Sequence, residues 1–188
     1  MKNAIIIHGT CNEEEYFDTE CASLSNSHWF PWLQKQLLTQ GVITQTPEML
    51  DAHIPDYKKW SRGFEIFNMN EETILIGYSC GGGFLTRWLS ENPVKINKLI
   101  LVAPWLDPER EKTLEFFDFK IDKTLIDRVN EIHLFVSSDD DKDILDSVET
   151  IKENLIGIQL HEYDDHGHFC FEDMGTEKFP ALLEVVLR

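Results

Sequence analysis

The sequence predicts an α/β fold, in which a mostly parallel sheet forms the middle of a three-layer α/β/α sandwich. Three short runs rich in Ile, Leu and Val are typical of strands covered on both faces: residues 4–7, 73–76 and 99–103. Strands and helices alternate along the whole chain, which favours parallel pairing with right-handed crossovers. Because 188 residues suit one hydrophobic core, we expect a single domain over residues 1–188.

The other elements follow from the same patterns. Alternating runs at residues 132–137 and 158–163 predict strands nearer an edge of the sheet, and residues 42–45 are a weaker candidate strand. Apolar residues at helical spacing predict helices over residues 29–40, 57–67, 84–91, 142–155 and 178–188. Two long segments have no clear element, residues 10–27 and 104–123. Loops of this length in a compact domain are more often functional than idle.

The composition disfavours several classes of partner. Lys and Arg number 17 against 34 Asp and Glu, which gives a net charge of -17. Such a charge repels phosphate backbones and anionic lipid surfaces, so we expect neither nucleic acid nor membrane as a partner. The apolar run near the N-terminus is too short for a signal sequence or a membrane span. The four cysteines have no C-x-x-C spacing, so we expect free thiols and a cytoplasmic location.

The most informative segment, residues 74–85, predicts a buried strand, a sharp turn and a helix, with the motif G-x-S-x-G at the turn. Gly77 and Gly81 lack the side chains that would keep the helix away from the strand. The consecutive glycines that open this helix lower its stability by up to about 1 kcal/mol each relative to alanine, which indicates a close approach of the backbone to another group. The segment predicts Ser79 as a nucleophile. Because no phosphate-binding glycine motif is present, we expect no cofactor.

A serine nucleophile needs a base, and the base needs an acid to orient it. In this type of fold the acid follows a late strand and the histidine follows the last strand. Candidates occur in that order: Asp139, Asp140 and Asp141, then His166 and His168. Donors for an oxyanion hole are expected from the backbone N–H of Cys80 and from the loop after the first strand, with Thr10 preferred over Cys11.

Other chemistries fit the sequence less well. Asp139, Asp141 and Asp143 alternate as in a calcium loop, but the glycine and distal glutamate of an EF-hand are missing. The histidines at 161, 166 and 168 match no standard zinc spacing, so we expect no metal site. A cysteine-dependent or redox role would use Cys80 or Cys11.

Several landmarks occur in a fixed order along nearly the whole chain. They are a first strand ending in His8-Gly9, the segment 29–33 at a helix start, the segment 76–81, the segment 138–140 after a strand, and Gly167-His168-Phe169 near the end. In this order they resemble the small serine hydrolases of the α/β-hydrolase superfamily, of the retinoblastoma-binding protein nine and YdeN type.

The resemblance implies a trimmed α/β-hydrolase fold with about six strands and little lid. It further implies Ser79 as nucleophile, His168 as base and Asp140 as acid. Family members often have a proline after the aspartate, whereas Asp141 follows here, so Asp139 or Asp141 could take the role. The acidic stretch over residues 12–26 is longer than the family leads us to expect.

These residues together predict hydrolysis of a small ester, thioester or amide, with a small-molecule acyl substrate. We expect the walls of the substrate pocket to come from residues 10–32 and 105–119, whose aromatic side chains favour an apolar acyl or aryl group, although aromatic clusters more often belong to a core than to a pocket. The alternative is a protein-interaction module on a hydrolase scaffold, with weak or vestigial esterase activity and a protein partner that the sequence does not identify.

Overall fold

The computed structural model describes residues 2–110, 112–113 and 115–188, and its centre is a six-stranded sheet of order β2-β1-β3-β4-β5-β6. Every neighbouring pair in this sheet is parallel. The strands are β1 (Asn3–Ile7), β2 (Ile43–Gln45), β3 (Thr73–Tyr78), β4 (Ile96–Val102), β5 (Val129–Ser137) and β6 (Gln159–Tyr163). The α/β fold class predicted from the sequence is therefore confirmed.

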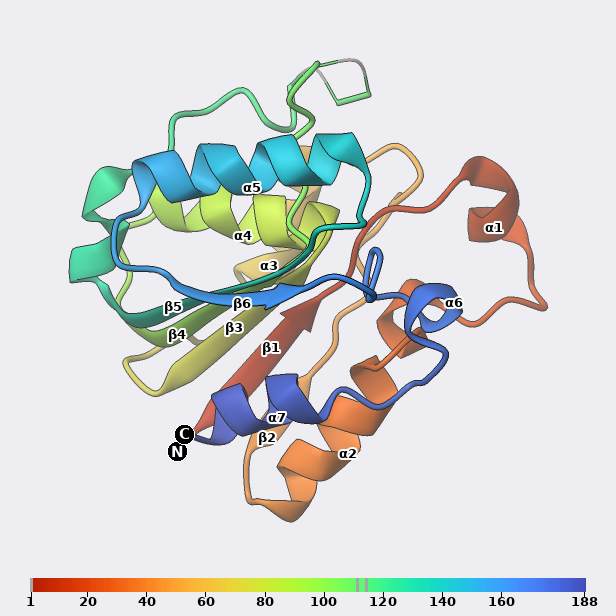
Figure 1. Ribbon diagram of the computed structural model, residues 1–188, viewed down its shortest axis with the longest axis horizontal. Coiled ribbons are helices and arrows are strands. Elements are labelled where there is room, and N and C mark those ends of the chain that lie inside the picture. Colours follow the sequence, from red (N-terminus) through yellow and green to blue (C-terminus); the bar gives the residue numbers. More distant parts are fainter. Residues whose placement is uncertain (1, 111, 114) are drawn as a thin grey trace.

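Helices cover both faces of the sheet, with α3, α4 and α5 on one face and α2 and α7 on the other (Figure 1). The bounds are α1 (Glu13–Phe17), α2 (Phe30–Thr39), α3 (Tyr57–Phe64), α4 (Cys80–Glu91), α5 (Lys142–Asn154), α6 (Phe171–Met174) and α7 (Pro180–Leu187), with 3-10 turns η1 (Leu24–Asn26) and η2 (Lys123–Asp127). Helix α4 begins at Cys80 rather than at Phe84, so the glycines lie inside it. Neither α1 nor α6 was expected from the sequence.

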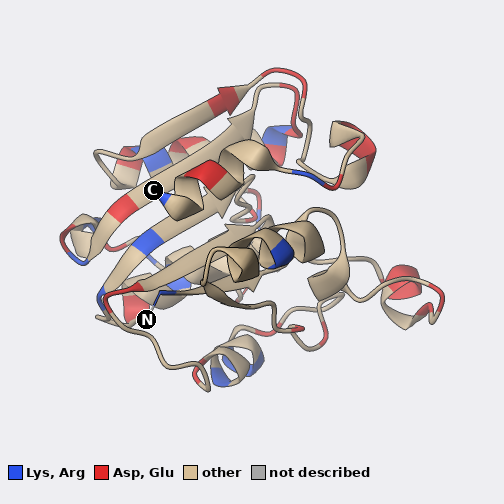
Figure 2. Cartoon of the chain, turned by 90° about the horizontal axis from the view of Figure 1, so that it is seen from below, with Lys and Arg blue, Asp and Glu red and all other residues tan. Residues whose placement is uncertain are grey.

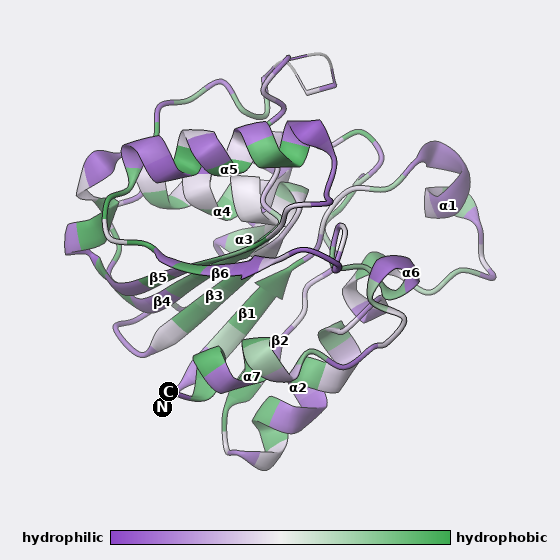
Figure 3. Ribbon diagram, in the orientation of Figure 1, coloured by the Kyte–Doolittle hydropathy of each residue, from purple (hydrophilic) through white to green (hydrophobic). Residues whose placement is uncertain are grey.

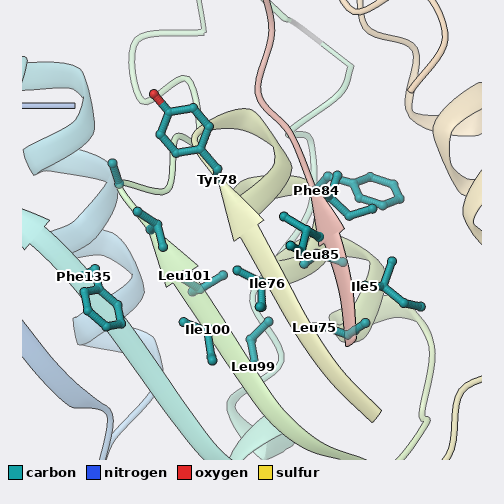
Figure 4. Close-up of a cluster of buried hydrophobic side chains, with 14 of the residues drawn as sticks. Ile5, Leu75, Ile76, Tyr78, Phe84, Leu85, Leu99, Ile100, Leu101 and Phe135 are labelled. Atoms are coloured by element: carbon teal, nitrogen blue, oxygen red, sulfur yellow. The ribbon is translucent and has the colours of Figure 1, made fainter. Parts of the chain in front are cut away.

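The core lies on the central strands. All six residues of β3 are buried, and β1 and β4 are nearly as enclosed. Their side chains meet those of α4, including Phe84 and Leu85 (Figure 4). The edge strands β2 and β6 are more exposed and more polar than the centre (Figure 3). Continuous apolar runs therefore mark the middle of the sheet, as expected for strands covered on both faces.

Acidic residues are distributed over the helices and loops (Figure 2), and in the whole sequence 34 Asp and Glu outnumber 17 Lys and Arg. Within the described ranges, every helix is too short or too polar to cross a bilayer.

Parallel pairing brings the carboxyl ends of the strands to one edge of the sheet. The loops that follow β1, β3, β5 and β6 therefore meet there, and they contain the residues that the sequence singled out. Helices α1 and α6 lie beyond the same edge (Figure 1).

Candidate active site

Ser79 occupies a sharp turn between β3 and α4. Its backbone has φ 53° and ψ -125°, a region that L-residues with side chains adopt at a cost of about 1–3 kcal/mol. Two hydrogen bonds hold the turn: the N–H of Ser79 donates to the carbonyl of Val102 (3.0 Å), and the N–H of Trp105 donates to the carbonyl of Ser79 (3.0 Å). The turn places the Ser79 hydroxyl at the carboxyl edge of the sheet.

The glycines of this segment are required because backbone lies where their side chains would be. A Cβ on Gly81 would lie 2.3 Å from the carbonyl oxygen of Ile7, and one on Gly77 would lie 2.5 Å from the Cα of Gly82. A Cβ on Gly83 would lie 2.1 Å from the carbonyl oxygen of Trp105. The close approach that the glycine run indicates is thus made to β1, to the turn itself and to the loop after β4.

The structure brings Ser79, His168 and Asp140 into one chain of hydrogen bonds. The Oγ of Ser79 lies 2.9 Å from Nε2 of His168. On the other side of the ring, Nδ1 lies 3.0 and 3.1 Å from the two carboxylate oxygens of Asp140. Because Nδ1 faces a carboxylate, we assign the ring proton to Nδ1, which leaves Nε2 as the acceptor of the serine proton. The Asp140 side chain is 2% exposed, so this carboxylate is shielded from water.

The competing aspartates and the competing histidine make other contacts. The carboxylate of Asp139 accepts hydrogen bonds from the Ser137 hydroxyl and from the N–H of Gly167 (3.0 Å). The Ser137 hydrogen bond is the main reason that the pKa of Asp139 lies below its ordinary value. Asp141 is exposed at the start of α5, and Nδ1 of His166 pairs with Asp165 (2.7 Å).

The backbone of His168 is also fixed, by Asp173 in α6. The N–H of His168 donates to Oδ2 of Asp173 (2.7 Å). Gly167 just before it has φ +48°, and a Cβ there would lie 2.5 Å from Cγ of Asp173. These contacts explain why a glycine precedes the histidine and why α6 follows it. The sequence did not predict α6.

The loop after β1 packs directly on the serine. A Cβ on Gly9 would lie 3.0 Å from the Cβ of Ser79 and 3.3 Å from its Oγ. Beneath this loop, Nδ1 of His8 donates to the carbonyl of Gly9 (2.7 Å) and Nε2 accepts the N–H of Met49 (2.8 Å). The His8 side chain is 1% exposed, and burial lowers its pKa, which favours the neutral ring.

His8 therefore fixes a peptide plane beside Ser79. In a trans peptide the C=O and N–H point in opposite directions. Holding the carbonyl of Gly9 thus also sets the direction of the N–H of Thr10. The sequence places His8 at the end of the first strand but does not reveal this contact, because Met49 lies 41 residues away.

A cavity of about 250 Å³ opens beside the serine and differs from the expected pocket. Its lining residues are Thr10, Ser79, Trp105, Lys112, Asp141, Asp143, Ile144 and His168. The expected segments contribute part of this lining, but the start of α5 was not foreseen. The expectation of an apolar pocket is wrong: Lys112, Asp141 and Asp143 make the lining polar, whereas Phe116 and Phe117 are buried in the core.

The thiols are poorly suited to nucleophilic chemistry. Cys80 is fully buried, and burial raises its pKa well above the usual value. Burial and the nearby carboxylates of Glu15 and Glu48 raise the pKa of Cys11 to about 11. Since the thiolate is the reactive form, both are largely unreactive at neutral pH. Among the described residues, no group of three or more His, Cys, Asp or Glu side chains is arranged to hold a metal ion.

Comparison with known proteins gives consistent results. The model of the family described as serine hydrolase matches residues 22–188. The YdeN protein of Bacillus subtilis (strain 168), named as a hydrolase, is 27% identical over 168 residues, which cover 86% of this chain and 88% of YdeN.

Solved structures share the fold. The crystal structure of the B. subtilis ydeN gene product has a TM-score of 0.80 at 26% identity, covering 100% of this chain and 97% of that one. A YdeN-like protein from Pectobacterium atrosepticum SCRI1043 has a TM-score of 0.65 at 17% identity, covering 99% and 90% of the two chains. Est1E from Butyrivibrio proteoclasticus has a TM-score of 0.66 at 16% identity, covering 98% and 85%. The six-stranded sheet is thus that of the α/β hydrolases.

Proposed function

The chain belongs to the serine hydrolase family, and on this premise we propose that it hydrolyses small esters, thioesters or amides through an acyl-enzyme on Ser79. The observation that carries the proposal is the chain of hydrogen bonds from Ser79 through His168 to Asp140. The separation of 2.9 Å between Oγ and Nε2 lies within the range required for direct proton transfer.

In the first half of the reaction, Nε2 of His168 takes the proton of the Ser79 hydroxyl as Oγ attacks the substrate carbonyl carbon. The Asp140 carboxylate stabilises the imidazolium that forms. The carbonyl oxygen becomes an oxyanion, for which the N–H groups of Cys80 and Thr10 are the proposed donors. Cys80 is the first residue of α4, so its N–H has no acceptor within the helix.

The tetrahedral intermediate then collapses, and the bond to the leaving group breaks. His168 gives its proton to that leaving group, and the acyl group stays on Oγ. A water molecule then loses a proton to Nε2 and attacks the acyl carbon. Release of the carboxylic acid returns the proton to Ser79, so neither oxidant nor cofactor is consumed.

The cavity indicates the class of acyl group. A volume of about 250 Å³ lies below the range of about 300–1,000 Å³ that is common for drug-sized ligands. Its polar wall, with Lys112 and Asp143, disfavours a long aliphatic chain because a chain there would desolvate charged groups. We propose short, polar acyl groups as substrates. Across p-nitrophenyl esters of increasing acyl length, kcat/KM should be highest for the shortest acyl groups; a maximum at octanoyl would contradict this proposal.

The decisive test is Ser79→Ala, measured with p-nitrophenyl acetate and with a fluorophosphonate probe. We expect both turnover and covalent labelling to be lost, because Oγ is the atom that becomes acylated. Ser90→Ala removes a hydroxyl on the same helix that donates to the Thr86 carbonyl and accepts the N–H of Asp122. It serves as the control and should keep both turnover and labelling. Labelling that persists in Ser79→Ala would refute the assignment.

A further inference from the structure

Three hydrogen bonds connect the loop that follows β5 with the loop that follows β6. They involve the residues just before Asp140 in one loop and just before His168 in the other. The contacts are the N–H of Ser138 to the carbonyl of Tyr163 (2.8 Å), the N–H of His166 to Oγ of Ser137 (3.0 Å), and the N–H of Gly167 to Oδ1 of Asp139 (3.0 Å). The imidazole of His168 then meets Asp140. Neighbouring aspartates thus contact neighbouring residues of the opposite loop.

Ser137 and Asp139 form a small rigid unit within this junction. The buried hydroxyl of Ser137 donates to Oδ1 of Asp139 and accepts the N–H of His166. Since the single hydroxyl proton is used toward Asp139, the direction of the Ser137 side chain is fixed. Oδ1 of Asp139 therefore receives two hydrogen bonds, one from its own loop and one from Gly167.

Gly167 and His168 are held from two sides. The N–H of Gly167 is bound by Asp139, and the next N–H, of His168, is bound by Asp173. Asp173 belongs to α6, which follows His168 in the same connection after β6. Its hydrogen bond to His168 therefore sets the internal shape of that connection. Asp139 belongs to the loop that carries Asp140, so it sets the distance between the two loops.

We propose that Asp139, supported by Ser137, is a positioning residue that places the imidazole of His168 within reach of Asp140 and Ser79 at the same time. The inference rests on the proposed function, because it concerns the efficiency of proton transfer through His168. Asp139 touches no reacting atom. It acts through the backbone of Gly167, which fixes the origin of the His168 side chain.

The test compares Asp139→Ala with Asp139→Asn. The alanine variant loses both hydrogen bonds, and because displacement of a catalytic group by 1 Å costs about 100-fold, we expect kcat to fall by about 10- to 100-fold with KM nearly unchanged. The asparagine side chain keeps an oxygen that accepts both hydrogen bonds, so Asp139→Asn should recover most of the wild-type kcat. Asp164→Ala, at an exposed aspartate on the same loop as His168, is the matched control and should behave as wild type.

A spectroscopic measurement separates positioning from general stability. The proton shared by Nδ1 of His168 and Asp140 should give a downfield proton NMR signal in the wild type and in Asp139→Asn. In Asp139→Ala this signal should weaken or move upfield, while circular dichroism remains that of a folded protein. Should Asp139→Ala not fold, Asp139→Glu takes its place: it keeps the charge but moves the acceptor, so kcat should fall.

Several results would overturn the proposal. Wild-type kcat in Asp139→Ala, or in Asp139→Glu where that variant replaces it, would show that the contact to Gly167 does not position His168. Equal losses in Asp139→Ala and Asp139→Asn would show that charge matters rather than hydrogen-bond geometry. Fluorophosphonate labelling that persists in Ser79→Ala would contradict the proposed function itself. If labelling is lost in Ser79→Ala but Asp139→Ala is fully active, only the positioning role is contradicted.

Discussion

The hydroxyl oxygen of Ser79 lies 2.9 Å from Nε2 of His168, although 89 positions separate the two residues in the sequence. Parallel pairing accounts for this meeting, because Ser79 follows β3 and His168 follows β6, and the carboxyl ends of both strands lie at one edge of the sheet. The same edge receives Asp140 from the end of β5 and Gly9 from the end of β1.

Asp140→Asn should impair catalysis far more than changes at neighbouring acids. An amide at this position no longer requires the proton on Nδ1 of His168, and loss of the correct tautomer in such a site lowers kcat by about 10⁴-fold. Steady-state kinetics with p-nitrophenyl acetate measure the effect. Asp146→Asn, on the exposed face of α5 where its carboxylate pairs with Lys142, is the control. Comparable small losses in both variants would place the acid elsewhere.

His8→Leu should lower kcat while leaving the binding of substrate nearly intact. The variant removes the donor that holds the Gly9 carbonyl, so the N–H of Thr10 loses its fixed direction, and weakening one oxyanion donor costs up to about 10²–10³-fold in kcat. It also leaves the N–H of Met49 without its acceptor, which should reduce the free energy of unfolding by about 1–3 kcal/mol.

Glu48→Gln provides the control for His8, since it removes the carboxylate that lies 3.6 Å from the ring but leaves both hydrogen bonds of the imidazole. Its kcat should stay close to that of the wild type. A His8→Leu enzyme with wild-type kcat would show that the Gly9 carbonyl needs no such support.

Gly81→Ala and Gly63→Ala should have opposite effects on stability. At Gly81 the new methyl would lie 2.3 Å from the Ile7 carbonyl oxygen, and overpacking of this kind lowers the free energy of unfolding by about 1–3 kcal/mol or more. At Gly63, within α3, no atom beyond the neighbouring residues and the backbone of the helix itself lies within 4 Å of the new methyl, so alanine should stabilise the protein by about 0.5–1 kcal/mol. Urea denaturation measures both effects, and an unchanged free energy of unfolding in Gly81→Ala would contradict the close packing of Gly81 on the Ile7 carbonyl.

Stability should decrease as the pH falls below the ordinary histidine pKa of 6.5. Burial lowers the pKa of His8, His133 and His161 in the folded state. Between the folded and unfolded values the unfolded chain binds more protons, so the free energy of unfolding rises with pH in that range. The stabilisation is present above 6.5 and is lost as the pH falls through the folded-state values.

Urea denaturation at several pH values between 7.5 and 5.5 checks this dependence. The ring of His133 makes hydrogen bonds to His161 (3.1 Å) and Glu131 (3.1 Å). His133→Asn should make the free energy of unfolding less dependent on pH. A free energy of unfolding that is constant across this range in the wild type would contradict the prediction.

Much of the fold could be predicted because its signals are local. The apolar runs of β1, β3 and β4 and the helical spacing of apolar residues are properties of short windows, and each strand was expected near its observed position. Helix α4 was expected to begin later, because the glycines in its first turn disfavour helix on their own. Their placement is decided by the contacts of Gly81 and Gly83 with β1 and the Trp105 loop.

The pocket illustrates the limit of such reasoning. Of the aromatic residues between 105 and 119, Trp105 lines the cavity. Phe116 instead packs against Trp60 with ring centroids 5.1 Å apart and belongs to the core. An aromatic cluster has the same appearance in a sequence whether it faces a core or a cavity. Lys112, Asp141 and Asp143 line the cavity together with Trp105 and make its wall polar.

The sequence by itself determined the class of fold, the turn that exposes Ser79, and the order in which a nucleophile, an acid and a histidine follow successive strands. These features depend on residues close together in the chain. The tertiary structure decided which aspartate and which histidine meet, and that His8 supports the Gly9 peptide. Such contacts depend on the distance between loops, and that distance is set by hydrogen bonds such as Asp139 to Gly167, whose partners are 28 residues apart.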